Sequence, residues 1–258
     1  FRKKKLIYVF HGPVAEEYEL ETGKKGTGYY LRQLIENFVL WRSNKIVVIS
    51  EYAKERMHKV FQKKAFNLGP LHNFNINRPR RNKDIIKRLK LLTVRRLTPR
   101  TGVRELCQLV ELSSDLELTV IGKGELLKSL QASQFKNTRF LGSVSDRKLR
   151  CAYKGHDLFV LPSVALEGFG LVVLEALASG IPVLVSKTSG GAAEFFEKID
   201  PEMLYEYDCG LDTFLRKIDY VFEVFKKNSV QNIVTALLKD SRAPEYARKF
   251  EREILNVL

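Results

Sequence analysis

Cysteine is scarce in this chain, and its spacing forms no motif. Three cysteines occur in 258 residues, at Cys107, Cys151 and Cys209. Their odd number and wide separation exclude a disulfide framework and the paired spacing of a structural zinc site. Isolated thiols of this kind are typical of a reducing compartment. We therefore expect a cytoplasmic protein that folds without disulfides or a structural metal.

Long hydrophobic runs are also missing. The chain has no apolar stretch near the roughly 20 residues that cross a bilayer as a helix. Its first residues are basic, but the apolar run at 6–10 is too short for the hydrophobic region of a secretory signal. With 45% hydrophobic residues, the composition excludes a mainly disordered chain. The length fits one large domain or two small ones.

Acidic residues are few in the first hundred positions. Residues 1–100 contain 24 Lys/Arg and 8 Asp/Glu, whereas residues 101–258 contain 20 and 22, so the net charge of +14 comes from the first segment. A concentration of positive charge in one segment attracts phosphate groups, whether of a nucleotide, an anionic membrane surface or a nucleic acid. Nucleic acid is not expected as a partner, because no known binding motif accompanies the charge. A solvated surface that serves solubility is the alternative interpretation.

Short apolar strands alternate with helical periodicity along most of the chain. This pattern predicts an α/β fold with a parallel sheet covered on both faces. Ser50 and Ser145 are predicted N-caps, and Trp41 is expected in the core. The predicted strands are 6–10, 45–50, 90–94, 116–121, 138–141, 157–161 and 181–185; the predicted helices are 31–41, 51–60, 102–110, 125–132, 145–154 and 171–179, with Leu31, Leu34, Ile35, Phe38 and Val39 on one face of the first.

The most informative window is residues 162–183, PSVALEGFGLVVLEALASGIPV. It predicts a strand end, a glycine-bearing loop, a helix and the next strand. Glycines let the backbone approach a ligand closely, and a helix N-terminus presents unpaired N–H groups to an anion. Glu167 lies in the loop, and Glu175 lies about one turn into the helix. This spacing of two glutamates around Gly-Phe-Gly is far more specific than a glycine loop alone.

The window resembles the Glu-x7-Glu motif of glycosyltransferase family 4, whose members are retaining enzymes with the GT-B fold. Segments 94–97, 120–124, 140–144 and 189–191 are similar to that family's phosphate-binding arginine, Gly-x-Gly, base-binding and following loops, in the same order. The resemblance spans about residues 6–200. It implies two Rossmann-like parallel-sheet domains and transfer of a sugar from a nucleotide-diphosphate sugar to an acceptor, a glycan or lipid-linked glycan, that the sequence does not identify.

The resemblance also implies roles for individual residues. Glu167 would contact the donor sugar, Glu175 the ribose, and Arg96 the diphosphate. His11 would lie beside the transferred sugar, although a structural cap is the alternative for this histidine. The backbone N–H groups of Phe169, Gly170 and Leu171 would hold the phosphate and the sugar. The main chain of Val144 would contact the base. No metal and no cofactor are expected, since no Asp-x-Asp motif occurs.

Two residues depart from the family's phosphate site. Arg95 stands where the family usually has glycine, and Thr101 where it often has lysine. Arg95 and Arg96 are adjacent, so one of them is expected to face solvent, and Arg96 is the favoured ligand. Arg100 is expected to supply the missing lysine's charge. Lys123 is a further phosphate candidate, although an exposed turn lysine is an equal interpretation.

The domain organisation departs from the family in length. Residues 1–79 are predicted to form a partial, truncated N-terminal acceptor-side domain, and 80–240 the nucleotide-sugar-binding domain, with a basic linker at 78–83. A C-terminal helix is predicted for 241–258. The short first domain leaves a second interpretation open, a non-catalytic nucleotide-sugar-binding module or subunit. The basic first segment suggests peripheral contact with an anionic membrane.

Overall fold

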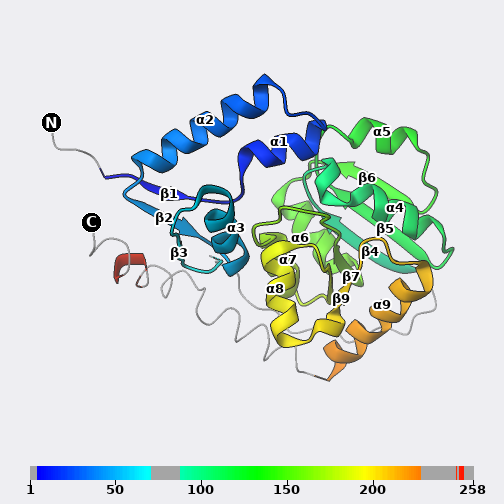
Figure 1. The fold of residues 1–258 in the computed structure, drawn as a ribbon. Helices are drawn as coiled ribbons and strands as arrows, with labels where there is room; N and C mark the ends of the chain where they lie inside the picture. The colour runs from blue at the N-terminus through cyan, green and yellow to red at the C-terminus, as the bar shows by residue number, and fades with distance from the viewer. Residues whose placement is uncertain (1–4, 71–87, 228–247, 249, 253–258) are drawn as a thin grey trace.

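Two parallel sheets organise the chain (Figure 1). The structure, a computed structural model, describes residues 5–70, 88–227, 248 and 250–252. The first sheet has the strand order β1-β2-β3, and the second has the order β6-β5-β4-β7-β8-β9. The prediction of an α/β fold with two parallel-sheet units is therefore confirmed.

The first unit is small and is centred on β2. Val47 and Val48 of β2 are fully buried on opposite faces, Val48 with Phe10 and Met57, and Val47 with Leu68. Phe250, near the end of the chain, packs against this second cluster. The elements of the unit are β1 (Ile7–Val9), α1 (Val14–Thr22), α2 (Thr27–Arg42), β2 (Lys45–Val48), α3 (Glu51–Phe61) and β3 (Phe66–Asn67).

The second unit contains the main core. All residues of its strands β7 and β8 are buried, and because successive side chains point to opposite faces, helices must cover both sides of the sheet. Its strands are β4 (Leu89–Val94), β5 (Leu116–Ile121), β6 (Thr138–Gly142), β7 (Leu158–Leu161), β8 (Val183–Ser186) and β9 (Leu204–Tyr205); its helices are α4 (Val103–Glu111), α5 (Leu127–Ala132), α6 (Asp146–Gly155), α7 (Leu171–Ala178), α8 (Gly190–Ile199) and α9 (Leu211–Lys226), with short 3-10 turns η1 (Pro99–Thr101) and η2 (Pro201–Met203).

The strand order places a crevice. The chain runs outward from β4 through β5 to β6, then returns to the other side of β4 and runs outward again from β7. In open α/β sheets, ligands bind at the carboxyl ends of the strands on either side of such a reversal. The residues that follow β4 and β7 are therefore the ones that the fold brings together around a ligand.

The two units meet along a hydrogen-bonded seam. The Ser50 side chain, the predicted N-cap of α3, accepts from the Ala53 N–H at 3.0 Å, which confirms the cap, and donates to the Gly168 carbonyl of the second unit at 2.7 Å. The Tyr52 N–H donates to the Glu194 carboxylate on α8 at 2.8 Å. The N-terminus of α3 is thereby tied to the loop after β7 and to helix α8 of the second unit.

Several predictions of elements are correct, and some elements were missed. Ser145 caps α6 as predicted. Helix α1 was not predicted, because four of its nine residues are glutamates and its apolar periodicity is weak. Helix α8 was missed because it begins with Gly190 and Gly191, which signal a loop. The predicted linker at 78–83, both predicted domain boundaries and most of the predicted C-terminal helix at 241–258 lie outside the described residues.

The prediction that Trp41 belongs to the core is wrong. Trp41 on α2 is 72% exposed, and Leu34 and Phe38 are 67% and 59% exposed. The apolar face predicted for this helix therefore faces outward, while Leu40 and Glu36 face the sheet. Burial of Glu36 raises the pKa of its carboxyl to about 7. Across the described part of the chain, no helix combines the length and apolarity needed to cross a membrane.

Candidate functional site

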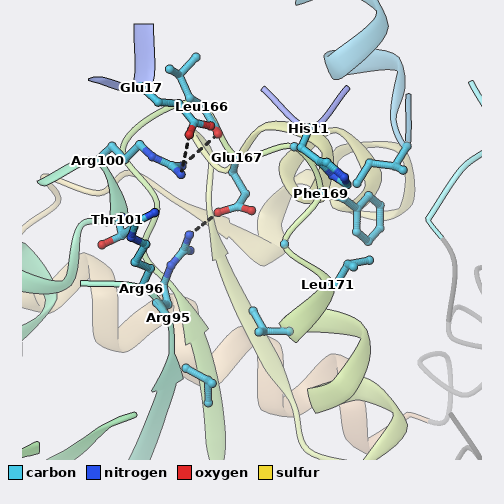
Figure 2. Close-up of a pocket in the computed structure, with 15 residues that line it drawn as sticks. His11, Glu17, Arg95, Arg96, Arg100, Thr101, Leu166, Glu167, Phe169 and Leu171 are labelled. Atoms are coloured by element: carbon cyan, nitrogen blue, oxygen red, sulfur yellow. Dashed lines mark hydrogen bonds and ion pairs between the residues drawn. The ribbon is translucent and has the colours of Figure 1, made fainter. Parts of the chain in front are cut away.

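A cavity of about 350 Å³ lies where the two units face each other (Figure 2). This volume falls within the range of small-molecule sites. It lies at the carboxyl ends of β4 and β7, the position that the strand order indicates. Three lining residues come from the first unit and the others from the second: His11, Glu17 and Ile49, with Val94, Arg95, Arg96, Arg100, Thr101, Leu166, Glu167, Gly168, Phe169, Gly170, Leu171 and Val172.

The loop between β7 and α7 forms one wall of the cavity. A side chain at Gly168 would place its Cβ 2.7 Å from the His11 carbonyl oxygen, so the first unit approaches here because position 168 is glycine. Leu166 has a φ of 53°, an uncommon conformation for a non-glycine residue. Gly170 caps α7 with a φ of 72°, and the N-terminal end of α7 faces the cavity. That end offers N–H donors to an anion.

Arg95 and Glu167 form an ion pair in the cavity wall (Figure 2). Their side chains are 7% and 15% exposed. Arg95 also donates to the hydroxyl of Ser163, which is fully buried and in turn donates to Glu167 Oε2 at 3.1 Å. Both contacts to Glu167 use Oε2. Glu167, the expected ligand of the donor sugar, is thus bound by Arg95, the residue that stands where the family usually has glycine.

Arg100 joins the two units across the same cavity. Its guanidinium lies 3.4 Å from Glu17 and 3.7 Å from Glu21, both on α1, and donates to the Leu166 carbonyl at 3.2 Å. Burial raises the pKa of the Glu17 carboxyl, and the Arg100 charge partly opposes this shift. Arg100 therefore lines the cavity as expected, but two carboxylates of another element already bind it.

The structure brings several predicted residues to one place. Arg95 and Arg96 both line the cavity, but the expectation that Arg95 faces solvent is wrong, because its side chain is only 7% exposed and Arg96 is the exposed one. His11 also lines the cavity and is exposed. The predicted backbone donors of the loop and of α7 complete this set: Phe169, Gly170 and Leu171. With Arg100, Glu17 and Glu167, the cavity lining combines three arginines, a helix N-terminus and two carboxylates.

Three predicted residues lie outside the lining of this cavity: Lys123, Val144 and Glu175. Lys123 is exposed in the turn after β5, and Val144 follows β6, so both continue along the same carboxyl edge of the sheet. Glu175 on α7 accepts a 2.9 Å hydrogen bond from the Tyr153 hydroxyl. Burial raises the pKa of Tyr153, and the Glu175 charge raises it further. Tyr153 thus stays a donor that orients Glu175.

Three residues that shape the site, Glu17, Ser163 and Tyr153, were not predicted from the sequence. Glu17 lies on α1, and this helix was not predicted because its apolar periodicity is weak. Ser163 and Tyr153 are buried polar groups whose roles depend on Arg95 and Glu175, 68 and 22 positions away, and no local pattern marks them. Among the described residues, no group of three or more His, Cys, Asp or Glu side chains could hold a metal ion.

The fold is shared with solved glycosyltransferase structures of the GT-B type. Sucrose-phosphate synthase from Thermosynechococcus elongatus superposes with a TM-score of 0.76 at 17% identity, covering 97% of this chain and 67% of that chain. Anabaena Alr3699/HepE in complex with UDP and glucose gives a TM-score of 0.74 at 17% identity, covering 99% and 72%. At this identity the likeness shows the fold alone.

The family follows from the sequence comparison. A profile of the family described as Glycosyl transferases group 1 matches residues 76–251, and the chain belongs to this family. Phosphatidyl-myo-inositol mannosyltransferase of Mycobacterium leprae is 34% identical over 94 residues, which cover 34% of this chain and 25% of the relative. An uncharacterized glycosyltransferase of Methanocaldococcus jannaschii is 28% identical over 179 residues, covering 60% and 45%. The matched segments thus cover 25% and 45% of the lengths of these two relatives.

Proposed function

We propose that the chain binds a nucleotide-diphosphate sugar and takes part in transferring the sugar to an acceptor with retention of configuration. The observation that carries this proposal is the cavity in which Arg95, Arg96 and the N-terminus of α7 face Glu167. Cations and helix N–H groups suit a diphosphate, and a carboxylate suits sugar hydroxyls. The family membership supports the same reaction class.

The proposed reaction breaks the bond between the sugar's anomeric carbon and the diphosphate oxygen. A new bond forms from that carbon to the acceptor oxygen on the same face, the nucleoside diphosphate leaves with the bonding electron pair, and its oxygen takes the proton that the acceptor loses. Negative charge develops on the leaving oxygens, where Arg96 and the α7 N–H groups would stabilise it. His11 lies on the opposite wall, on the side of the first unit, where the acceptor would enter.

The nucleotide would lie along the carboxyl edge of the second sheet. Glu175 stands there on α7, held by Tyr153, and is the proposed ribose ligand. We expect a thermal-shift screen of UDP-, GDP- and ADP-sugars to find a stabilising ligand, by about 2.7 kcal/mol at 100 times its dissociation constant. Glu175→Ala should weaken nucleotide and nucleotide-sugar binding alike, whereas exposed Glu125→Ala is the matched control. No stabilisation by any of these ligands would rule out the proposed function.

A binding module without catalysis is the second candidate. The observation that favours it is the first sheet, which has three strands among the described residues. Its edge strand β1 has Val9 exposed, and Leu6 just before it is exposed as well. Slow release of sugar from the bound donor would support the enzyme. Nucleotide-sugar binding without hydrolysis or transfer would favour the module.

An exposed apolar stripe on α2 supports a proposal about location. The stripe has basic residues at both ends of the helix, Lys24 and Lys25 before it and Arg42 in its last turn. We propose that it lies against an anionic membrane, because interfacial helices combine such an apolar face with basic and aromatic flanks. The stripe consists of Tyr30, Leu31, Leu34, Ile35, Phe38 and Trp41, each more than half exposed.

Trp41 is the only tryptophan in the chain, so it reports directly on this surface. Its emission should shift to shorter wavelength when vesicles containing phosphatidylserine are added, and the shift should shrink as salt rises. Leu34→Ser should weaken binding about 10-fold, since burying a leucine is worth roughly 1.5–3 kcal/mol. Leu112→Ser, which alters an equally exposed leucine on α4's end, should change nothing. Unchanged Trp41 emission at low salt would exclude the α2 surface as the contact.

A further inference from the structure

Among the described residues, the ion pair between Arg95 and Glu167 leaves the Arg95 Nε without a hydrogen-bond partner. The Arg95 side chain is more than nine-tenths buried. The contacts from Arg95 and Ser163 both go to Glu167 Oε2, so neither uses Oε1. A buried arginine donor without an acceptor is costly, because its desolvation is not compensated. The cavity wall thus holds a cation with an unmet donor.

The neighbouring arginine is differently placed. The Arg100 Nε also lacks a hydrogen-bond partner among the described residues, but it lies 3.7 Å from Glu21, and Glu17 forms a second ion pair with the same guanidinium. Arg95 has one carboxylate partner, and that partner is the proposed ligand of the donor sugar. A molecule with phosphate at one end and hydroxyls at the other could satisfy Arg95 and Glu167 separately and at the same time.

We propose that Arg95 and Glu167 exchange partners when the donor binds. The diphosphate oxygens accept the Arg95 N–H groups, and the sugar hydroxyls donate to the Glu167 carboxylate in place of Arg95. Arg95 is then the second cation of the diphosphate site, in the role that the sequence analysis expected of Arg100. This inference rests on the proposed function, since it requires a nucleotide-diphosphate sugar in the cavity.

Partner exchange makes Glu167 act in opposite directions on two ligands. A nucleoside diphosphate must take Arg95 from Glu167 and leaves that carboxylate without compensation next to an anion. A nucleotide sugar compensates it through its hydroxyls. Glu167→Ala should therefore tighten nucleoside-diphosphate binding by about 10-fold and weaken nucleotide-sugar binding by about 10-fold. A residue that only supports the loop would weaken both.

The experiment is a double-mutant cycle measured by calorimetry, with the nucleoside diphosphate and nucleotide sugar that the screen selects. Arg95→Ala should weaken both ligands, and in that background Glu167→Ala should no longer tighten the diphosphate. Glu17→Ala is the matched control, since it removes another carboxylate of the same cavity whose partner is Arg100. If loss of negative charge were the whole cause, this variant would tighten the diphosphate as well. Glu167→Gln, which keeps the side-chain volume, repeats the test if the alanine variant unfolds.

The outcomes separate the two proposals. Binding of the diphosphate that weakens in Glu167→Ala, or a tightening that persists without Arg95, overturns partner exchange and leaves the proposed function standing. A wild-type chain that binds neither UDP, GDP, ADP nor their sugars overturns both. Opposite changes for the two ligands, abolished by Arg95→Ala, support the exchange.

Discussion

Gly190→Ala should destabilise the protein by about 2–5 kcal/mol. An alanine Cβ at this position would lie 1.8 Å from the Glu167 carbonyl oxygen and 2.9 Å from the Tyr52 ring. The backbone φ of 49° adds a further cost for any residue with a Cβ. Overpacking costs about 1–3 kcal/mol and the left-handed conformation about 1–2 kcal/mol. Such a loss is a large part of the stability of an ordinary domain.

Urea unfolding of matched variants measures this effect. Gly155→Ala is the control, because a Cβ there meets nothing within 4 Å and α6 ends at this residue without a positive φ. This variant should stay within about 0.5 kcal/mol of the wild type. Gly190→Ala should also lose donor binding, since the atoms that must move belong to Glu167. Equal stability of Gly190→Ala and Gly155→Ala would contradict the prediction, because it would show that the Glu167 carbonyl and the Tyr52 ring can move aside without a loss of stability.

The strands and the glutamate loop were predictable because their signals are local. Apolar runs such as 157–161 mark buried strands, and the parallel order then fixes which ends gather around a ligand. Glu167 and Glu175 belong to one loop and helix, so their spacing alone relates them. These predictions needed no knowledge of distant residues.

The partners of the site residues were not predictable in the same way. Arg95 and Glu167 are 72 positions apart, and Ser50 meets Gly168 across 118 positions. Such contacts depend on how the two units face each other, which no local pattern encodes. The error at Trp41 has the same cause. Helical spacing shows that an apolar face exists, but it does not show whether another part of the molecule covers it.

Arg96 and Arg100 should differ sharply in their effect on diphosphate binding. Arg96 is exposed at the end of β4 and lines the cavity, so its guanidinium can reach a phosphate there. A hydrogen bond to a charged group contributes roughly 1.5–3 kcal/mol, so Arg96→Ala should weaken nucleoside-diphosphate binding about 10- to 150-fold. Binding of the nucleoside without phosphates should barely change. Calorimetry with the two ligands gives both numbers.

Arg100→Ala should act mainly on the contact between the units. Removing this guanidinium leaves Glu17 and Glu21 close together without their cation. Burial raises the pKa of Glu17 and Arg100 partly opposes this, so removing Arg100 should raise that pKa further. The loss of stability should therefore be greater above the pKa, where Glu17 is ionised, than below it. Diphosphate binding should fall by less than about 10-fold, since the guanidinium already has two carboxylate partners. If Arg100→Ala instead matches Arg96→Ala in its effect on the diphosphate, Arg100 replaces the family's lysine as the sequence suggested, and α1 must release it when the ligand binds.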